Sequence, residues 1–554
     1  MLSPEESTEL ADILFPKVTE SITDIEATFP PRIASFVTRI APSPTGFLHI
    51  GALYMTLINV QLTHQNNGVF FLRIEDTDDK RETETGVSDI LSGLARFGVH
   101  IDEGAIGENM TEIGNYGPYT QSKRSQYYHI FAKHLVQKGL AYPCFLNESE
   151  TEEIRNSQSA IGKAPGIYGN YSPWRNESFE NITARIASGI PYVLRLHAPG
   201  IVGARIHVVD EIRGKLEMDD NFLDIVLLKK NGIPTYHFAH IVDDHLMGTT
   251  HVIRAEEWLP SLPLHYQIFK SFGITPPKYA HTAQLMKIDG GNKRKLSKRK
   301  DPEANVTYFF EAGYPINAIK NYLCGLLDSG FEEWKLTHMD TPYSDYTFDF
   351  ARMPKSGALF DLKKLDSVSN IYLSHLSNTD LFEEMSTWAK EYNPEFYAKM
   401  NVQKELAFKA ISIQRGTDRD PKKFTKLSDV VNYLKPFLKD TFATLKQSRS
   451  EIVLPVEASL VKKIIADYAS SYSDNQSGDE WLTWMREQAA KFQFARDSAE
   501  FKAGGCIGKF GDFAMIIRVA IAGSTQSPDL YEMMQVLGKE EVVKRLGEFG
   551  VELI

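Results

Sequence analysis

Cysteine is scarce in this sequence, with three in 554 residues (Cys144, Cys324 and Cys506) and no C-x-x-C pair. This count disfavours both a disulfide framework and a cysteine-rich zinc site, and it fits a reducing compartment. No apolar run approaches the roughly 18–20 residues that a membrane-spanning helix needs. We therefore expect a cytoplasmic protein with no membrane partner.

Residues 1–35 lack the character of a targeting signal. They hold seven acidic and two basic side chains, whereas a mitochondrial presequence is rich in arginine and a secretory signal needs an apolar core. We expect an acidic N-terminal extension with a helix near Glu5–Leu14.

The overall balance, 42% hydrophobic and 24% charged residues with a formal net charge of −11, indicates a globular chain. Its length predicts three to five domains. The net charge argues weakly against a nucleic-acid partner, but the local charge of the contacting face matters more. Two segments are basic: residues 287–300 carry a net charge of +6, and residues 399–426 carry +5.

The stretch Arg39–Gly51, RIAPSPTGFLHIG, lies between a predicted strand at Phe36–Ile40 and a predicted helix at Ala52–Asn66. It is neither the dinucleotide pattern G-x-G-x-x-G nor the P-loop G-x-x-x-x-G-K. A strand, a stiff turn and a helix start still make a phosphate-binding corner, because unpaired N–H groups and the helix dipole face the ligand.

A second strand is predicted at Val69–Ile74, and it leads directly into the acidic cluster Glu75–Asp79. The two strands and the helix between them form a βαβ unit, whose ligands gather at the carboxyl ends of the strands. Arg39 and the acidic cluster would then face one crevice. The alternative is a solvated turn that caps a helix at Glu84–Phe97.

Residues 117–235 interrupt this alternation and read as an inserted α/β module. We expect the doubly wound sheet to resume at residues 234–244, and residues 251–254 to form another short strand that delivers Arg254 to a strand end. From about residue 303 onward the apolar positions keep helical spacing, so an all-α half follows the α/β half.

Residues 289–300, DGGNKRKLSKRK, combine two glycines with six basic residues. The glycines allow a hinge, so the lysines would arrive on a mobile loop. A solvated basic turn or a localisation tract is the alternative. Together with the phosphate corner and the arginines at strand ends, the loop favours attack of a bound carboxylate on the α-phosphate of ATP, with the protein positioning both reactants.

Six blocks resemble class I glutamyl-tRNA synthetases of the bacterial type. Residues 39–51 resemble the RIAPSPTG…HIGH signature and residues 295–299 resemble the KMSKS loop. Four further blocks match in order, at residues 73–78, 234–237, 242–248 and 252–258. The resemblance runs from about residue 37 through 330, continues more weakly to the end, and leaves residues 1–35 outside.

The resemblance implies ATP-dependent ligation of L-glutamate to the 3′ end of tRNA(Glu) through a glutamyl-adenylate, with Mg²⁺ bridging the phosphates. It assigns glutamate binding to Arg39, Ala41, Ser43, Glu75, Tyr236, His240 and Arg254. It assigns ATP binding to His49, Gly51, Trp258, Lys295 and Lys298. Catalysis falls to Lys298, Lys295 and His49.

The resemblance also implies a Rossmann-like doubly wound parallel sheet with an inserted acceptor-binding module, followed by a helical anticodon-binding half. The domains we expect are an extension (1–35), the catalytic domain (36–116 and 236–300), the inserted module (117–235), a stem-contact region (301–370) and two anticodon-binding parts (371–470 and 471–554).

Departures from the family pattern are few. Ala52 replaces the last histidine of HIGH, and His240 stands where some relatives carry Asn, so substrate contact and simple packing are alternatives for it. Some relatives hold zinc in the inserted module through several cysteines, but only Cys144 remains there, so no zinc is expected. Lys422 or Lys423 is a candidate anticodon reader, with a solvated helix end as the alternative.

Three alternative functions differ in the tRNA that is charged, in the amino acid that is attached, or in the absence of catalysis. The enzyme would be non-discriminating if it also charged tRNA(Gln) with glutamate, and glutaminyl-tRNA synthetase is the competitor within the family. A non-catalytic RNA-binding protein derived from a synthetase is a remote alternative. We expect a monomer.

Overall fold

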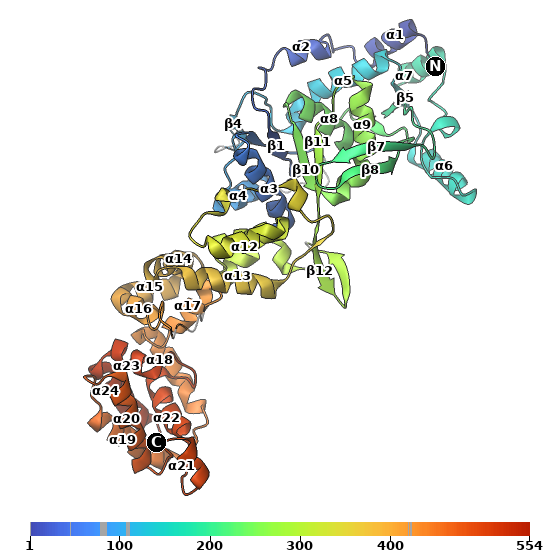
Figure 1. Cartoon of the computed structure of the whole chain (residues 1–554). Helices are drawn as coiled ribbons and strands as arrows, with labels where there is room; N and C mark the ends of the chain where they lie inside the picture. Colours follow the sequence, from blue (N-terminus) through green and yellow to red (C-terminus); the bar gives the residue numbers. More distant parts are fainter. Residues whose placement is uncertain are drawn as a thin grey trace. The chain divides into compact units, whose positions relative to one another are not determined.

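The computed structural model describes residues 2–44, 46–77, 86–106, 111–297, 299–418, 420 and 424–553. The chain divides into two compact units (Figure 1). The first comprises Met1–Tyr308 with Lys320–Asp361, and the second comprises Phe309–Ile319 with Leu362–Ile554.

A mainly parallel sheet forms the centre of the first unit. One part has the order β1 (Val37–Ile40), β2 (Val69–Leu72), β3 (Glu103–Ala105) and β4 (Glu112–Ile113), and only β4 is antiparallel to its neighbour. The other part has the order β10 (His251–Ala255), β11 (Lys278–Thr282), β7 (Arg205–Asp210) and β8 (Gly214–Asp219), with β8 antiparallel.

The two parts meet where the backbone N–H of Thr250 donates to the Val37 carbonyl at 3.1 Å. β1 therefore lies beside β10, and the order of the strands reverses at this point. In doubly wound sheets the crevice at such a reversal is where ligands bind. The predicted doubly wound sheet is confirmed.

Helices cover this sheet. They are α3 (Ile50–Gln65), α4 (Gly86–Arg96), α8 (Tyr236–Leu246), the short η4 (Glu256–Ser261) and α9 (Leu262–Ser271). The predicted strand at Phe36–Ile40 and the predicted helix at Ala52–Asn66 correspond to β1 and α3, and α3 begins two residues earlier than expected. α3 is buried along most of its length. Asn59 Nδ2 donates to Ile253 O on the sheet, and Gln65 Nε2 donates to Phe348 O, which comes from a later segment of the same unit.

The expectation that the sheet resumes at residues 234–244 is wrong. Residues 236–246 form α8, with Thr235 in the extended conformation as its N-cap residue. The buried side chains of Phe238, Ile241 and Val242 recur at helical spacing, so they pack as one face of a helix. Along the chain the central sheet resumes earlier, at β7, within the segment predicted as the inserted module. The predicted strand at 251–254 is β10 of the same sheet.

The inserted segment folds around a small antiparallel sheet, β5 (Ala141–Cys144), β6 (Val193–Leu196) and β9 (Val226–Leu228). Its helical elements are η2 (Gln121–Arg124), α5 (Ser125–Gln137), α6 (Glu148–Ala160), η3 (Gly169–Tyr171) and α7 (Phe179–Ala187). β7 and β8, which fall in the same stretch of sequence, belong to the central sheet instead.

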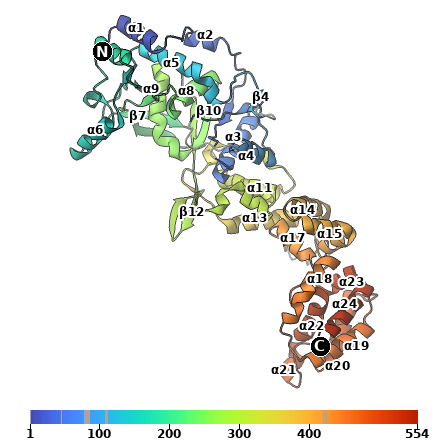
Figure 2. The same ribbon diagram turned by 180° about the vertical axis from the view of Figure 1, so that it is seen from behind.

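The N-terminal extension forms α1 (Pro4–Leu14) and α2 (Ile22–Glu26), which lie beside α5 in both views (Figures 1 and 2). The predicted helix near Glu5–Leu14 is confirmed. Leu10 and Ala11 are buried in the same core as α5, and Asp12 pairs with Lys133 of α5 at 2.7 Å. The extension is thus an integral part of the first unit.

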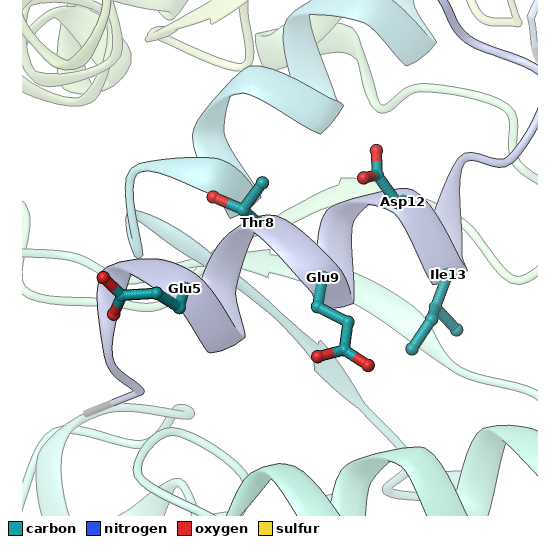
Figure 3. Close-up of a pocket in the computed structure, with 5 residues that line it drawn as sticks. All are labelled: Glu5, Thr8, Glu9, Asp12 and Ile13. Carbon is teal, nitrogen blue, oxygen red and sulfur yellow. The ribbon is translucent and has the colours of Figure 1, made fainter.

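The outer side of α1 carries a shallow hollow lined by Glu5, Thr8, Glu9, Asp12 and Ile13 (Figure 3). These five side chains bring three carboxylates and no cation. They would repel a phosphate, so the hollow does not resemble a nucleotide site.

After the central sheet, β12 (Leu285–Asp289) and β13 (Asn292–Lys295) form a hairpin that projects from the first unit in both views (Figures 1 and 2). β14 (Ala358–Leu359) pairs with β12 in parallel, which is an exception to the expected all-α second half. The helices nearby are η5 (Pro302–Ala304), α10 (Val306–Ala312), α11 (Ile316–Leu327), α12 (Ser329–Thr337), η6 (Tyr343–Asp345) and η7 (Phe350–Arg352).

In the described residues of the second unit the regular elements are all helices, apart from an isolated β-bridge between Phe494 and Gly508. Its core runs from Leu373 to Phe549. The elements are α13 (Leu362–His375), α14 (Asn378–Tyr392), α15 (Pro394–Val402), α16 (Lys404–Ile411), α17 (Leu427–Leu434), α18 (Lys439–Ser448), η8 (Arg449–Glu451), α19 (Ala458–Ser471), α20 (Gly478–Lys491), α21 (Ser498–Ala503), α22 (Phe510–Ala522), α23 (Leu530–Leu537) and α24 (Lys539–Glu552). Within the part of the chain that the structure describes, no helix has the length and apolar character needed to cross a membrane.

Candidate active site

A cavity of about 690 Å³ opens at the carboxyl ends of β1, β2 and β10, where the strand order reverses. Ten of the residues predicted from the sequence line it, namely Arg39, Ala41, Ser43, His49, Gly51, Glu75, Tyr236, Arg254, Trp258 and Lys295. His240 does not line it, and Lys298 lies outside the described residues.

The start of α3 forms the phosphate-binding corner of the cavity. His49 is the N-cap residue, and its Nδ1 accepts a hydrogen bond from the Gly51 backbone N–H at 2.9 Å. A Cβ atom on Gly51 would lie 2.9 Å from that same Nδ1. Residue 51 must therefore lack a side chain for the histidine ring to rest on the helix end, whose dipole favours an anion.

A buried network of charges supports the amino-acid side of the cavity. Arg73 is fully buried, and its guanidinium donates to Asp244 Oδ1 at 2.6 Å and to Glu75 Oε1 at 3.0 Å. Arg39 shares Asp244 through its Nε at 3.3 Å. Asp243, the preceding residue on α8, accepts a hydrogen bond from Arg124 Nε at 2.6 Å. Because such pairs are isolated from water, each carboxylate fixes the arginines around it.

The two carboxylates next to Arg73 differ in their electrostatics. Burial by itself would raise the pKa of Asp244, but Arg39 and Arg73 hold it well below its ordinary value. Burial raises the pKa of Glu75, and Arg73 opposes this shift without cancelling it. Glu75 faces the cavity, so a cationic group placed beside it would stabilise its ionised form.

Arg254 is the second arginine of the site, and only 6% of its surface is exposed. Its guanidinium donates to His281 Nε2 at 3.0 Å and to His265 Nδ1 at 3.2 Å, and it lies 3.5 Å from the Tyr236 hydroxyl. Among the described residues no carboxylate pairs with it. A buried cation without an anion is costly, so this position favours a ligand that carries a carboxylate.

His240 lies behind the wall of the cavity. It is fully buried, its Nδ1 lies 3.0 Å from Asp244 Oδ2, and its Nε2 lies 3.2 Å from the Tyr279 hydroxyl. Burial lowers its pKa to about 3, although Asp244 opposes the shift. Its ring stacks against Tyr236 at an angle of 14°. His240 therefore acts on the cavity through Tyr236 and the Asp244 network.

Aromatic and apolar side chains complete the cavity. The rings of Tyr236 and Trp258 lie 4.3 Å apart between their centroids. The larger apolar side chains of the lining include Met55, Ile253, Leu285 and Leu296. The site thus combines polar groups at the helix start and at the two arginines with an apolar wall that suits a flat heterocycle.

The hairpin that carries Lys295 is fixed by ion pairs. Lys295 pairs with Glu257, and both line the cavity. Arg294, on β13 of the hairpin, donates to both carboxylate oxygens of the buried Asp301, at 2.6 and 2.8 Å. Asp301 also accepts from the Ser297 backbone N–H, which ties the start of the basic loop to the hairpin.

Several residues that the fold brings to the site carry no signal in the sequence. Thr77, Gln121 and Lys229 line the cavity, and His265 and His281 hold Arg254 from behind. Residues 74 and 120 pair in parallel, which places Gln121 next to the acidic end of β2. No local pattern signals this, because the pairing joins segments 46 residues apart. In the described residues, no group of three or more potential metal ligands is arranged to hold an ion.

Comparisons with known proteins agree with this geometry. Residues 35–367 match the family model "tRNA synthetases class I (E and Q), catalytic domain", and residues 479–549 match an anticodon binding domain. A glutamate–tRNA ligase from Acetivibrio thermocellus is 43% identical over 97% of this chain and 98% of its own length. One from Clostridium perfringens is 40% identical over 98% and 99%. The alignment with the A. thermocellus protein leaves about 3% of the 554 residues uncovered, or about 17. The expectation that residues 1–35 lie wholly outside the similarity is therefore wrong.

A solved structure is also similar. The glutamate tRNA ligase of Elizabethkingia meningosepticum, determined in complex with its amino acid, superposes with a TM-score of 0.72 at 27% identity. The match covers 94% of this chain and all of the other. The similarity thus extends over both units.

Proposed function

Because the chain belongs to the glutamate–tRNA ligase family of class I tRNA synthetases, we propose that it joins L-glutamate to the 3′ end of tRNA(Glu) in two steps. An oxygen of the glutamate α-carboxylate attacks the α-phosphorus of ATP, and diphosphate leaves. A hydroxyl of the terminal tRNA ribose then attacks the carbonyl carbon of the adenylate, and AMP leaves. Neither step requires a nucleophile from the protein.

The observation that carries glutamate as the substrate is the buried guanidinium of Arg254, which faces the cavity without a carboxylate partner among the described residues. An arginine pairs with a carboxylate through two parallel hydrogen bonds and has no acceptor for an amide N–H group. Arg39 offers a second cation, and Glu75 suits the α-ammonium group. Glutamine would leave one guanidinium unpaired, so strong discrimination needs no editing.

ATP would lie between the helix start and the basic loop. His49 and the backbone N–H groups near Gly51 would bind phosphate oxygens, and the apolar wall beside Trp258 would receive the base. Lys298 and Lys295 would stabilise the charge that builds up on the phosphate oxygens in the transition state. Mg²⁺ would come with the triphosphate, which supplies its oxygen ligands, and no protein ligand is assigned to it.

The tRNA would contact both units, with the anticodon read by the helical one, in which residues 479–549 match an anticodon-binding domain. Lys422 and Lys423, the candidate anticodon readers, lie outside the described residues. A monomeric state and a reducing, cytoplasmic location are part of the same proposal, the latter from the three cysteines, none of which is in a disulfide.

The direct test is aminoacylation of purified tRNA(Glu) and tRNA(Gln) with labelled glutamate and, separately, labelled glutamine. Glutamate on tRNA(Glu) alone is the expected result. Glutamate on both tRNAs would identify a non-discriminating enzyme, and no glutamyl product on either tRNA would refute the proposal. Glutamine on tRNA(Gln) would identify the competing activity.

The role of the loop is tested with Lys298→Ala, assayed with tRNA present. We expect a loss of at least about 100-fold in kcat with little change in the KM for glutamate, because the lysine acts in the transition state. Lys293→Ala, which removes an exposed lysine from the same hairpin, is the matched control. A rise in KM alone would contradict the transition-state role.

A further inference from the structure

Behind Arg254 lies a buried histidine–aspartate pair that does not reach the cavity. His281 on β11 is fully buried, and Asp210 at the end of β7 is 1% exposed. Asp210 Oδ2 accepts from the backbone N–H of His281 at 3.0 Å and from its ring Nδ1 at 2.7 Å. Asp210 Oδ1 accepts from the backbone N–H groups of Ile212 and Arg213, at 3.0 and 2.9 Å. Every contact of this carboxylate is thus with a donor.

The contacts of His281 determine which ring nitrogen carries its proton. The Nε of an arginine can only donate, so His281 Nε2, at 3.0 Å from Arg254 Nε, must accept. The proton then sits on Nδ1, where Asp210 receives it. Burial also lowers the pKa of His281, although Asp210 opposes the shift, so the ring is neutral at neutral pH. Asp210 therefore selects the tautomer that leaves a lone pair for Arg254.

Arg254 is held from several directions that together fix the plane of its guanidinium. His281 binds Nε, while His265 Nδ1 and the Trp258 carbonyl accept from Nη2 at 3.2 and 3.4 Å. The Tyr279 ring lies 5.0 Å from the centre of the guanidinium. These partners are neutral. They orient the cation without neutralising its charge, which a carboxylate in the same place would do.

We propose that Asp210 and His281 are positioning residues that orient Arg254 for a substrate carboxylate. This inference rests on the proposed function, because it takes glutamate as the molecule that Arg254 binds. Glutamate affinity then depends on a carboxylate that never touches the substrate. The pair leaves Arg254 oriented and still fully charged for its ligand.

The test is Asp210→Asn, which keeps the size of the side chain and replaces one acceptor with a donor. Whichever way the amide turns, its NH₂ faces two N–H donors. Backbone N–H groups cannot give up their proton, but the His281 ring can change tautomer, so the NH₂ should turn toward Nδ1. The His281 proton then moves to Nε2, where it opposes Arg254 Nε–H. We expect the KM for glutamate to rise about tenfold or more, with kcat and the KM for ATP within about threefold of the wild type.

Two further variants separate positioning from general destabilisation. Asp102 shows the same pattern away from the cavity, because its Oδ2 accepts from His64 Nε2 at 3.0 Å and from the Phe70 backbone N–H at 2.7 Å. Asp102→Asn should therefore leave the KM for glutamate unchanged. His281→Gln retains an acceptor oxygen for Arg254 and should keep the KM within about threefold, whereas His281→Leu should raise it as Asp210→Asn does.

Nitrogen-15 NMR of labelled histidine supplies a readout that general destabilisation does not move. The wild type should show His281 protonated on Nδ1, and Asp210→Asn should shift the proton to Nε2. An unchanged KM in Asp210→Asn, or an equal rise in Asp102→Asn, would overturn the positioning role. A wild-type enzyme that forms no glutamyl-tRNA would instead overturn the proposed function, so the two failures are distinguishable.

Discussion

Gly51 shows how a single missing side chain prepares the phosphate end of the site. Alanine at this position would bring its Cβ to 2.9 Å from His49 Nδ1, so the ring would leave the helix start. We expect Gly51→Ala to raise the KM for ATP about tenfold and to lower kcat, with a smaller effect on glutamate. Steady-state aminoacylation at varied ATP concentrations measures this.

Gly511 provides the control for that substitution. It is the second residue of α22, as Gly51 is the second residue of α3, and a Cβ there would meet no atom within 4 Å. Gly511→Ala should leave the kinetics unchanged and stabilise the protein slightly, by up to about 1 kcal/mol. Equal kinetic effects of the two variants would show that helix propensity, not the histidine ring, is responsible.

His240 makes the stability of the active-site region depend on pH. Its pKa in the folded protein is about 3, below the ordinary 6.5, because burial disfavours the charged, protonated ring. Between these values the unfolded chain binds the proton and the native state does not, so stability falls as pH decreases through 6.5. Between pH 6.5 and pH 5, this one group should lower the free energy of unfolding by about 2 kcal/mol.

Replacing that histidine isolates its contribution. His240→Asn retains a donor toward Asp244 and does not titrate, so its stability should fall about 2 kcal/mol less over the same pH interval. Hydrogen exchange of β10 amides, corrected for intrinsic exchange rates, measures the difference at pH 6.5 and 5. Identical losses in both proteins would mean that His240 already carries a proton in the native state.

Residues that reach the cavity from a strand end or a helix start could be predicted from the sequence, because their motifs are local. Arg39, His49 and Glu75 are of this kind. Asp210 and His281 could not be predicted, since 71 residues separate them and only the parallel pairing of β7 with β11 brings them together. His240 shows the limit of a motif, which identifies a position but not whether its side chain faces the cavity.

At the scale of elements, Arg32 supplies the ionic contact between the N-terminal extension and the central sheet, beside the packing of Phe29 on Tyr116. Arg32 makes two hydrogen bonds with Glu103 on β3, at 2.6 and 2.9 Å, and donates to the Met247 carbonyl after α8. Its guanidinium lies 3.7 Å from the centre of the Tyr116 ring. Both ionic partners are mostly buried, at 13% and 15% exposure, so Arg32→Ala should destabilise the first unit by about 2–4 kcal/mol.

Arg205 is the surface counterpart of Arg32. It binds Asp219 at the same distance of 2.6 Å, but the two side chains are 46% and 77% exposed. Because water screens this pair, Arg205→Ala should change stability by less than about 1 kcal/mol. Thermal unfolding of both variants compares the two pairs. A loss of stability in Arg32→Ala as small as that in Arg205→Ala would mean that apolar packing, not this ion pair, holds the extension in place.

The sequence predicts most elements near the site correctly, and its failure at residues 234–244 has a physical cause. Residues 234–244 contain a short apolar run with polar neighbours, and such a run fits a buried strand or a helix equally well. Thr235, at the N-cap, was the available signal for a helix. The sequence also predicts the first helix of the extension, but the partners of the extension on α5, on β3 and after α8 lie too far along the chain to be inferred.

At the scale of the whole molecule, the sequence predicts an α/β half followed by helices, because periodicity changes along the chain. The division into compact units is less simple, since residues 309–319 group with the second unit while residues 320–361 return to the first. A chain that leaves and re-enters a unit has no composition signal at the crossing points. Sequence position alone therefore does not reveal this division.

Each unit has a hydrophobic core of its own, which predicts more than one unfolding transition. Leu135 on α5 and Leu546 on α24 are both fully buried, each in the core of a different unit. Replacing either leucine by alanine removes the same apolar groups. Each change should lower the free energy of unfolding of its own unit by about 2–5 kcal/mol and leave the other unit unchanged. In calorimetry, Leu135→Ala and Leu546→Ala should each lower the midpoint temperature of a different unfolding transition. A single transition lowered by both would mean that the two cores unfold as one cooperative structure.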